Sequence, residues 1–178
     1  MMLSVVATLA LSTSAAPAPA DGPPVAVFAE LDGIWRGTFV GYDAAGKELY
    51  RLEVEQEYRT IDDHTQQVRL RDTDSKGQTV TGKGRNVARW KDGELILECI
   101  VEKSNGDRVV HEGRLVRGPQ GETELIWFSR KKGRVETFRE RVQSSEQGDV
   151  YAIDGMGVYG ETPILMAGRY RRVKPSTP

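Results

Sequence analysis

Residues 86–110, NVARWKDGELILECIVEKSNGDRVV, contain the clearest folding signal in the chain. Two short turn sequences, Asp92-Gly93 and Asn105-Gly106, separate runs that are rich in Val, Ile and Leu. Asp-Gly and Asn-Gly favour the type I′ turn, whose twist matches that of two antiparallel strands. This stretch therefore predicts two successive β-hairpins.

Similar turn signals divide most of the sequence into ten predicted strands, with no helical pattern of apolar residues between them. The predicted strands are residues 34–43, 47–60, 64–73, 79–90, 95–103, 108–117, 122–130, 135–144, 149–159 and 162–173. Ten antiparallel strands carry too much twist to remain one open sheet. We therefore predict an all-β fold, a ten-stranded antiparallel up-and-down β-barrel. Residues 25–31 favour a short N-terminal helix that ends at Gly33.

The first 20 residues have the pattern of an export signal. An apolar run from Leu3 to Leu11 precedes Ala18-Pro19-Ala20, which matches the small-x-small cleavage pattern. The apolar run is too short to cross a bilayer, so we expect no stable membrane insertion. We expect an exported protein, periplasmic or extracellular, with a signal peptide at 1–20, a linker and short helix at 21–32, one barrel domain at 33–174 and a tail at 175–178.

Composition excludes several classes of function. The 178 residues include 25 Lys and Arg against 26 Asp and Glu, a formal net charge of −1. This balance provides no basis for nucleic-acid binding, which relies on a basic surface. A single Cys excludes a disulfide within the chain and any multi-Cys zinc site, and two His leave little room for a histidine metal site. We therefore expect no metal and no cofactor.

Pairing outward from the turns assigns the side chains to two faces. Asp92-Gly93 places Trp90 opposite Leu95, and a two-residue turn at Asn105-Gly106 places Cys99 opposite Glu112. The face that collects two of the three Trp residues is predicted to be the interior. Its members are Val80, Ala88, Trp90, Leu95, Leu97, Cys99, Val101, Val110, Val116, Leu125, Trp127, Phe138 and Val142. The opposite face, with Ile96, Ile100, His111, Ile126, Phe128 and many charged residues, is predicted to face solvent.

Four polar residues fall on the predicted interior face, and we interpret them as part of a ligand site: Asn86, Glu112, Arg114 and Glu140. A charged group inside a barrel is costly unless it is paired or hydrated. Glu112 and Arg114 alternate so that both project inward, where they would orient an amphipathic ligand while aromatic rings cover its apolar part. The predicted ligand-binding residues are Asn86, Trp90, Glu112, Arg114, Trp127, Phe138 and Glu140. An internal ion pair bridged by trapped water is the alternative.

The opening of the first predicted strand, Gly33-Ile34-Trp35-Arg36-Gly37, carries a family resemblance. Gly-x-Trp at this place resembles the calycin superfamily, whose lipocalin-like barrels hold small hydrophobic molecules, and the run to Tyr42 is similar to nitrobindin-like barrels. The resemblance implies that Trp35 plugs one barrel end and that an Arg of the last strand, Arg169, Arg171 or Arg172, stacks over it. Nitrobindin-like proteins bind haem through a late His, and no His follows His111 here.

Three classes of function are compatible with these features. The leading hypothesis is an exported lipocalin-like protein that binds a small amphipathic or hydrophobic molecule in its barrel and is not an enzyme. The second is an interaction module that forms a homodimer or docks a partner through the outer stripe of Ile96, Ile100, Ile126 and Phe128. The third is an enzyme that uses Glu112 or Glu140 as a carboxylate base.

Overall fold

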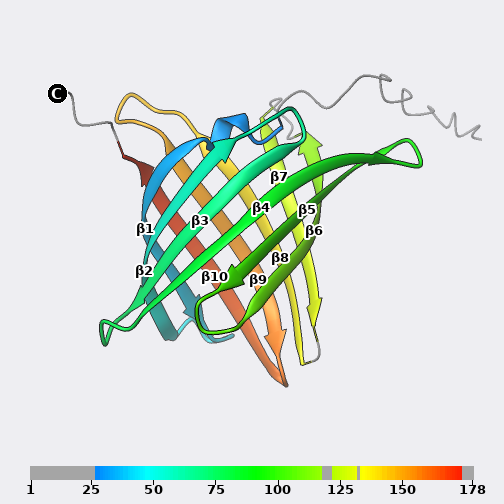
Figure 1. Ribbon diagram of the computed structural model, residues 1–178. Coiled ribbons are helices and arrows are strands. Elements are labelled where there is room, and N and C mark those ends of the chain that lie inside the picture. Colours follow the sequence, from blue (N-terminus) through cyan, green and yellow to red (C-terminus); the bar gives the residue numbers. More distant parts are fainter. Residues whose placement is uncertain (1–26, 118–121, 132, 174–178) are drawn as a thin grey trace, which may run out of the picture.

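The computed structural model describes residues 27–117, 122–131 and 133–173. All ten predicted strands are present, and each begins and ends within one residue of its predicted bounds. They are β1 (Gly33–Tyr42), β2 (Glu48–Thr60), β3 (Thr65–Asp74), β4 (Thr79–Lys91), β5 (Glu94–Lys103), β6 (Arg108–Arg117), β7 (Thr123–Lys131), β8 (Arg134–Gln143), β9 (Val150–Tyr159) and β10 (Thr162–Arg172). Each strand pairs antiparallel with its neighbours in sequence (Figure 1).

The sheet closes on itself because β1 also pairs with β10, with Trp35 opposite Arg172. Closure removes the unpaired edges that an open sheet would present to other chains. The predicted ten-stranded up-and-down barrel is therefore confirmed. Among the described residues, no helix has the length and apolar character needed to cross a membrane.

The predicted N-terminal helix is only a single 3₁₀ turn, η1 (Ala29–Leu31), at one end of the barrel (Figure 1). The turn ends at once because Asp32 leaves the helical conformation and its carboxylate accepts hydrogen bonds from Thr60 and Gln66. These bonds direct the chain into β1. The predicted signal peptide, most of the predicted linker and the predicted tail lie outside the described residues.

The predicted register is confirmed between β4 and β5 and wrong between β5 and β6. The turn after β5 contains three residues, 104–106, because Lys103 N donates to Asp107 O and Gly106 N donates to Lys103 O. Gly106 takes φ +83°, the left-handed conformation that completes a three-residue turn. Cys99 therefore pairs with His111 rather than Glu112. A shift of one residue turns every β6 side chain to the other face.

The next loop contains a compensating difference. It spans residues 118–122, one more than predicted, so that Gly113 rather than Glu112 pairs with Trp127. The two shifts cancel, and Trp127 pairs with Phe138 as predicted. Only β6 is therefore inverted. Val110 and Val116 are exposed, whereas His111 and Leu115 occupy interior positions.

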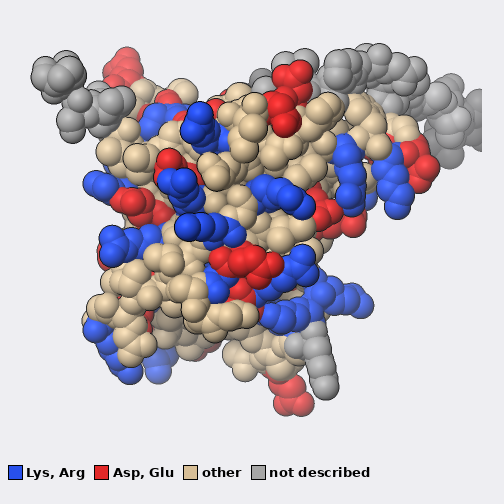
Figure 2. Space-filling view, viewed as in Figure 1, with Lys and Arg blue, Asp and Glu red and all other residues tan. Residues whose placement is uncertain are grey.

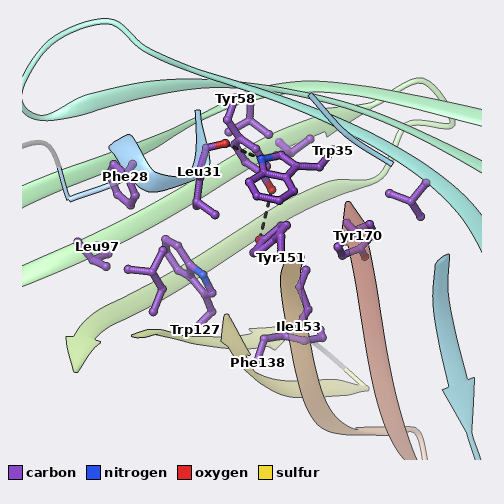
Figure 3. Close-up of a cluster of buried hydrophobic side chains, with 14 of the residues drawn as sticks. Phe28, Leu31, Trp35, Tyr58, Leu97, Trp127, Phe138, Tyr151, Ile153 and Tyr170 are labelled. Atoms are coloured by element: carbon purple, nitrogen blue, oxygen red, sulfur yellow. Dashed lines mark hydrogen bonds between the residues drawn. The ribbon is translucent and has the colours of Figure 1, made fainter. Parts of the chain in front are cut away.

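Trp35 closes the barrel at the η1 end, as the family resemblance implied. Its side chain is fully buried, its indole Nε1 donates to the Leu31 carbonyl at 2.7 Å, and its ring packs on Tyr151 (Figure 3). The Arg172 guanidinium lies over the indole, 4.2 Å from the ring centre. We call Phe28, Leu31, Trp35 and Arg172 the plug.

The predicted stacking of Arg169 or Arg171 on Trp35 is wrong. Arg172 is the residue that pairs with Trp35 between β1 and β10. Side chains alternate along a strand, so Arg169 and Arg171 point to the opposite side of the sheet from Arg172. Arg169 instead forms an ion pair with Asp154, and Arg171 is exposed. Alternation along β10 therefore decides which arginine stacks on the plug.

The outer surface carries charges of both signs. Figure 2 shows Lys and Arg side chains next to Asp and Glu side chains across one face of the barrel. Many of them are paired across neighbouring strands, as in Arg36–Glu55 at 2.6 Å and Arg108–Glu102 at 2.8 Å. Exposed ion pairs of this kind contribute about 0–1 kcal/mol each to the free energy of unfolding, so they add little to the stability of the barrel.

Candidate functional site

The barrel interior contains a cavity of about 360 Å³. This volume lies in the lower part of the range of roughly 300–1,000 Å³ that is typical of ligand sites. The cavity extends from the plug toward the opposite barrel end, and all ten strands contribute to its wall. Its aromatic members are Phe39, Tyr50, Tyr58, Trp127, Phe138, Tyr159 and Tyr170, and its aliphatic members include Leu52, Val54, Val68, Leu70, Val101, Val109, Ile153 and Met166.

Gly113 helps to keep the cavity open. It faces Trp127 across the β6–β7 pair, and a Cβ atom at this position would lie 2.5 Å from the Trp127 ring. The ring can therefore lie against the β6 wall only because residue 113 has no side chain. Any larger residue at this position would push the indole toward the lumen.

Ionised side chains gather at the end of the cavity away from the plug, which we call the mouth. Asp72, Lys103, Arg134 and Glu136 lie at or near the ends of their strands on this side, and the neutral Tyr159 hydroxyl lies beside Glu136. Lys103 Nζ donates to Asp72 at 2.9 Å, and both side chains are mostly buried. The mouth therefore presents paired charges rather than a net field of either sign.

Glu136 is the central group of the mouth. Its side chain is 2 % exposed and accepts hydrogen bonds from Arg134 Nη2, at 2.6 Å, and from the Tyr159 hydroxyl. His111 Nε2 lies 3.8 Å from its other oxygen, and the Arg134 guanidinium also covers the Tyr159 ring. Burial raises the pKa of Glu136, but the nearby His111 and the hydrogen bonds from Arg134 and Tyr159 outweigh this effect and lower the pKa to about 2.

Acid should therefore weaken the fold through Glu136. A carboxyl whose folded pKa lies below its unfolded value of about 4.3 stabilises the fold above that pH. The stabilisation disappears as the pH falls from about 4.3 toward 2. Allowing for solvent screening at the mouth, we expect a loss on the order of 2 kcal/mol. The measurement is urea unfolding of the wild type and Glu136→Gln at pH 7 and pH 3.

In that experiment the wild type should lose more stability than Glu136→Gln between the two pH values. Glu112→Gln, on the outer face, is the matched control and should follow the wild type. Parallel pH profiles for the wild type and Glu136→Gln would contradict the assignment.

Glu140 lies deeper in the barrel than Glu136 and has a different environment. Its side chain is partly buried and borders both the cavity and a small crevice. Burial raises the pKa of Glu140 above its ordinary value, and the Trp127 indole, the Tyr151 hydroxyl and His111 only partly offset this increase. In the described part of the chain, the buried Trp127 Nε1 has no acceptor at good hydrogen-bonding geometry.

A chain of amide hydrogen bonds connects the cavity to the plug. Gln66 Nε2 donates to the Phe28 carbonyl and to Asp32, both at 2.8 Å. Because those partners only accept, the Gln66 oxygen must face Asn86, whose Nδ2 donates to it at 3.0 Å. Asn86 Oδ1 is left buried without a donor among the described residues. The inner end of the cavity therefore has one buried hydrogen-bond acceptor that no donor among the described residues satisfies.

The structure brings four of the seven predicted ligand-binding residues together. Asn86, Trp127, Phe138 and Glu140 line the cavity. Trp90 is 40 % exposed because β4 extends past the plug end of the barrel. Its predicted place in the site is wrong.

The predicted inward clamp of Glu112 and Arg114 is also wrong. The inverted register of β6 places both on the outer face, where they form a 3.0 Å ion pair with each other. The same inversion brings His111, predicted to face solvent, into the cavity wall beside Phe138. The sequence reasoning also missed Arg134 and Glu136. Their alternation with Phe138 along β8 is the signal that would have found them.

The cavity wall contains the single Cys of the sequence, Cys99. Burial raises the pKa of the Cys99 thiol to about 12, so the group stays protonated at neutral pH. Within the described ranges, no cluster of three or more His, Cys, Asp or Glu side chains is placed to hold a metal ion. Cys99 acts as a small apolar residue of the cavity wall.

Comparison of the sequence with protein-family models finds no match, and neither does comparison with curated proteins. Among solved structures, the S-type phycobiliprotein lyase CPES from Guillardia theta is similar, with a TM-score of 0.58, 10% identity, and coverage of 84% of this chain and 92% of that chain. A de novo fluorescence-activating β-barrel matches with a TM-score of 0.42, 14% identity, and coverage of 84% and 99%. At these identities the likeness concerns the fold alone. The chain is a small closed antiparallel β-barrel with an internal cavity.

Proposed function

We propose that this protein binds a small amphipathic molecule inside its barrel. The observation that carries the proposal is the cavity of about 360 Å³, whose wall is aromatic and aliphatic and whose ionised groups gather at the mouth. Such a distribution suits a ligand with an apolar body and polar ends, because apolar area provides affinity and a few polar groups fix orientation. A lipocalin-like role within the calycin superfamily is part of this proposal, supported by the stacking of Arg172 on Trp35.

We also propose that the protein is exported. Its support is the apolar run at Leu3–Leu11 with the small-x-small pattern that ends at Ala20. A barrel without disulfides is compatible with an oxidising compartment because Cys99 has no second Cys to pair with. The proposed mature protein begins at Asp21.

We propose binding rather than catalysis or self-association as the primary role. Of the two carboxylates considered as a base, Glu112 faces outward and only Glu140 lines the cavity. The outer stripe proposed for dimerisation offers little accessible apolar surface, since Ile96 is 7 % exposed and Ile100 and Ile126 are partly buried. Phe128, at 47 %, is its most exposed member.

Filling the cavity should abolish binding. The probe is N-phenyl-1-naphthylamine, a neutral amphipathic dye whose fluorescence rises in apolar surroundings. We expect the wild type to bind it saturably, and Leu70→Trp to bind at least tenfold more weakly because the indole occupies the lumen, about 1.4 kcal/mol or more. The matched control is Leu165→Trp on the outer face, where Leu165 is 47 % exposed and dye affinity should not change.

Both variants are first checked for an unchanged urea midpoint, so that a loss of binding reports on the cavity. Equal dye affinity in the wild type and Leu70→Trp, or a wild type that shows no saturable binding, would contradict the proposed function.

A further inference from the structure

The charges that line the cavity do not balance. Three acidic side chains face it, and two of them have cationic partners within the wall: Asp72 pairs with Lys103, and Glu136 pairs with Arg134. The third, Glu140, forms no salt bridge with any Lys or Arg in the part of the chain that the structure describes. The inner half of the cavity therefore contains one carboxyl group without a counter-ion.

The groups that surround Glu140 are neutral donors and aromatic rings. Trp127 and Tyr151 face the carboxyl group from β7 and β9, and Tyr58, Cys99 and Tyr170 approach it from β2, β5 and β10. Burial raises the pKa of each of these phenols and of the thiol, so none of them supplies a charge at neutral pH.

Two charged residues and one imidazole complete the surroundings. His111, on β6, also faces Glu140, but its Nε2 lies 3.8 Å from the Glu136 carboxylate. Glu30 and Arg141 border a small separate crevice beside Glu140, and Arg141 is paired with Asp154 at 2.9 Å. No fixed cation is thus available to Glu140 from these elements.

Aromatic rings around an unpaired carboxyl group form a favourable site for a cation. An isolated carboxylate in such surroundings is costly, and a positive charge placed beside it removes much of that cost. The faces of Trp and Tyr rings attract cations as well. Trp127, Tyr58, Tyr151 and Phe138 converge on this part of the interior (Figure 3). Asn86 Oδ1, with no donor among the described residues, adds a second acceptor on the cavity wall.

We infer that the inner end of the cavity is a site for the positively charged nitrogen of an amphipathic amine, with Glu140 as its counter-ion. The inference rests on the proposed function and specifies its ligand class. The ammonium group would lie beside Glu140 among the aromatic rings, and the apolar body would extend along Val101, Ile153 and Met166 toward the mouth.

Release of a proton from Glu140 when the amine binds would identify this arrangement. Glu140 must be ionised to pair with the amine, whereas burial favours its protonated form in the empty protein. Binding of a cation lowers the pKa of Glu140, so the complex forms with release of a proton wherever Glu140 starts protonated. Amine affinity should therefore rise with pH through the pKa of Glu140, while the affinity of a neutral analogue stays constant.

A matched pair of probes tests the inference: 4-phenylbutylamine, cationic at neutral pH, and 4-phenylbutan-1-ol, neutral and nearly the same shape. Affinities are measured by displacement of N-phenyl-1-naphthylamine and by calorimetry in two buffers of different ionisation enthalpy. We expect the wild type to bind the amine at least tenfold more tightly than the alcohol. In Glu140→Gln the amine should lose at least tenfold in affinity and its proton release, while alcohol affinity is retained.

Glu112→Gln, which removes a carboxylate from the outer face, is the control and should bind both probes like the wild type. Glu140→Gln should fold at least as stably as the wild type at pH 8, because the amide avoids the cost of ionising a buried carboxyl. Equal affinities for amine and alcohol, or an amine preference that survives in Glu140→Gln, would overturn the inference and leave the proposed function intact. Failure of the wild type to bind the dye and both probes would overturn the proposed function itself.

Discussion

Replacement of Trp35 by Ala is expected to lower the free energy of unfolding by about 3–5 kcal/mol, the range for a fully buried aromatic residue. The indole has no solvent-exposed surface and packs on Tyr151 with ring centres 5.5 Å apart. Its Nε1 donates to the Leu31 carbonyl, and the Arg172 guanidinium covers its face. Truncation removes all three contacts and leaves a void at the barrel end. Urea unfolding followed by circular dichroism measures the loss.

Trp90→Ala is the control for this measurement. The Trp90 side chain is 40 % exposed and does not line the cavity or belong to the buried core. Its removal should cost less than about 1 kcal/mol, because partly exposed side chains lose little buried area. Equal losses for the two substitutions would show that Trp35 does not seal the barrel.

Replacement of Gln66 by Leu should cost about 2–4 kcal/mol, although the two side chains have similar volumes. Gln66 is fully buried and joins three elements: its Nε2 donates to Phe28 and Asp32, and its oxygen accepts from Asn86. Leucine breaks all three bonds and leaves the Asn86 amide without any partner among the described residues. Each buried polar group that loses its partner costs about 1–3 kcal/mol.

Gln67→Leu is the matched control, since Gln67 is the next residue of β3 and its side chain points to the other face of the sheet. It should change the free energy of unfolding by no more than about 0.5 kcal/mol. The plug should also loosen in Gln66→Leu, and faster hydrogen exchange at the amides of Leu31 and Asp32 would report it. Unchanged exchange together with wild-type stability would contradict the role of Gln66 as the tie between plug and wall.

The strands were predictable because their signals are local. Turn residues, alternation and β-branched content act over a few neighbouring positions, and all ten strands match within one residue. The Asp92-Gly93 turn was equally clear, with φ of +52° and +80° at its two residues. Face assignment on β4, β5, β7 and β8 followed from the same alternation.

The β6 register was not predictable because Ser104-Asn105-Gly106 suits either a two-residue or a three-residue turn. The choice depends on which cross-strand pairs then pack inside the barrel, and it moves Glu112 out and His111 in. The predicted ligand site was therefore wrong at its two β6 positions. Trp127, Phe138, Asn86 and Glu140 were found, while the inward clamp of Glu112 and Arg114 was not.

The sequence by itself thus determined the strand count and the barrel class, since these depend on short-range patterns, while the role of Trp35 was implied by a family resemblance. Only the tertiary structure decided that Arg172 covers Trp35, that His111 and Glu136 meet at the mouth, and that Glu140 has no Lys or Arg partner among the described residues. The environment of a buried charge is the sum of contacts from strands far apart in sequence. For Glu140 those contacts come from β2, β5, β6, β7, β9 and β10, which closure of the barrel brings together.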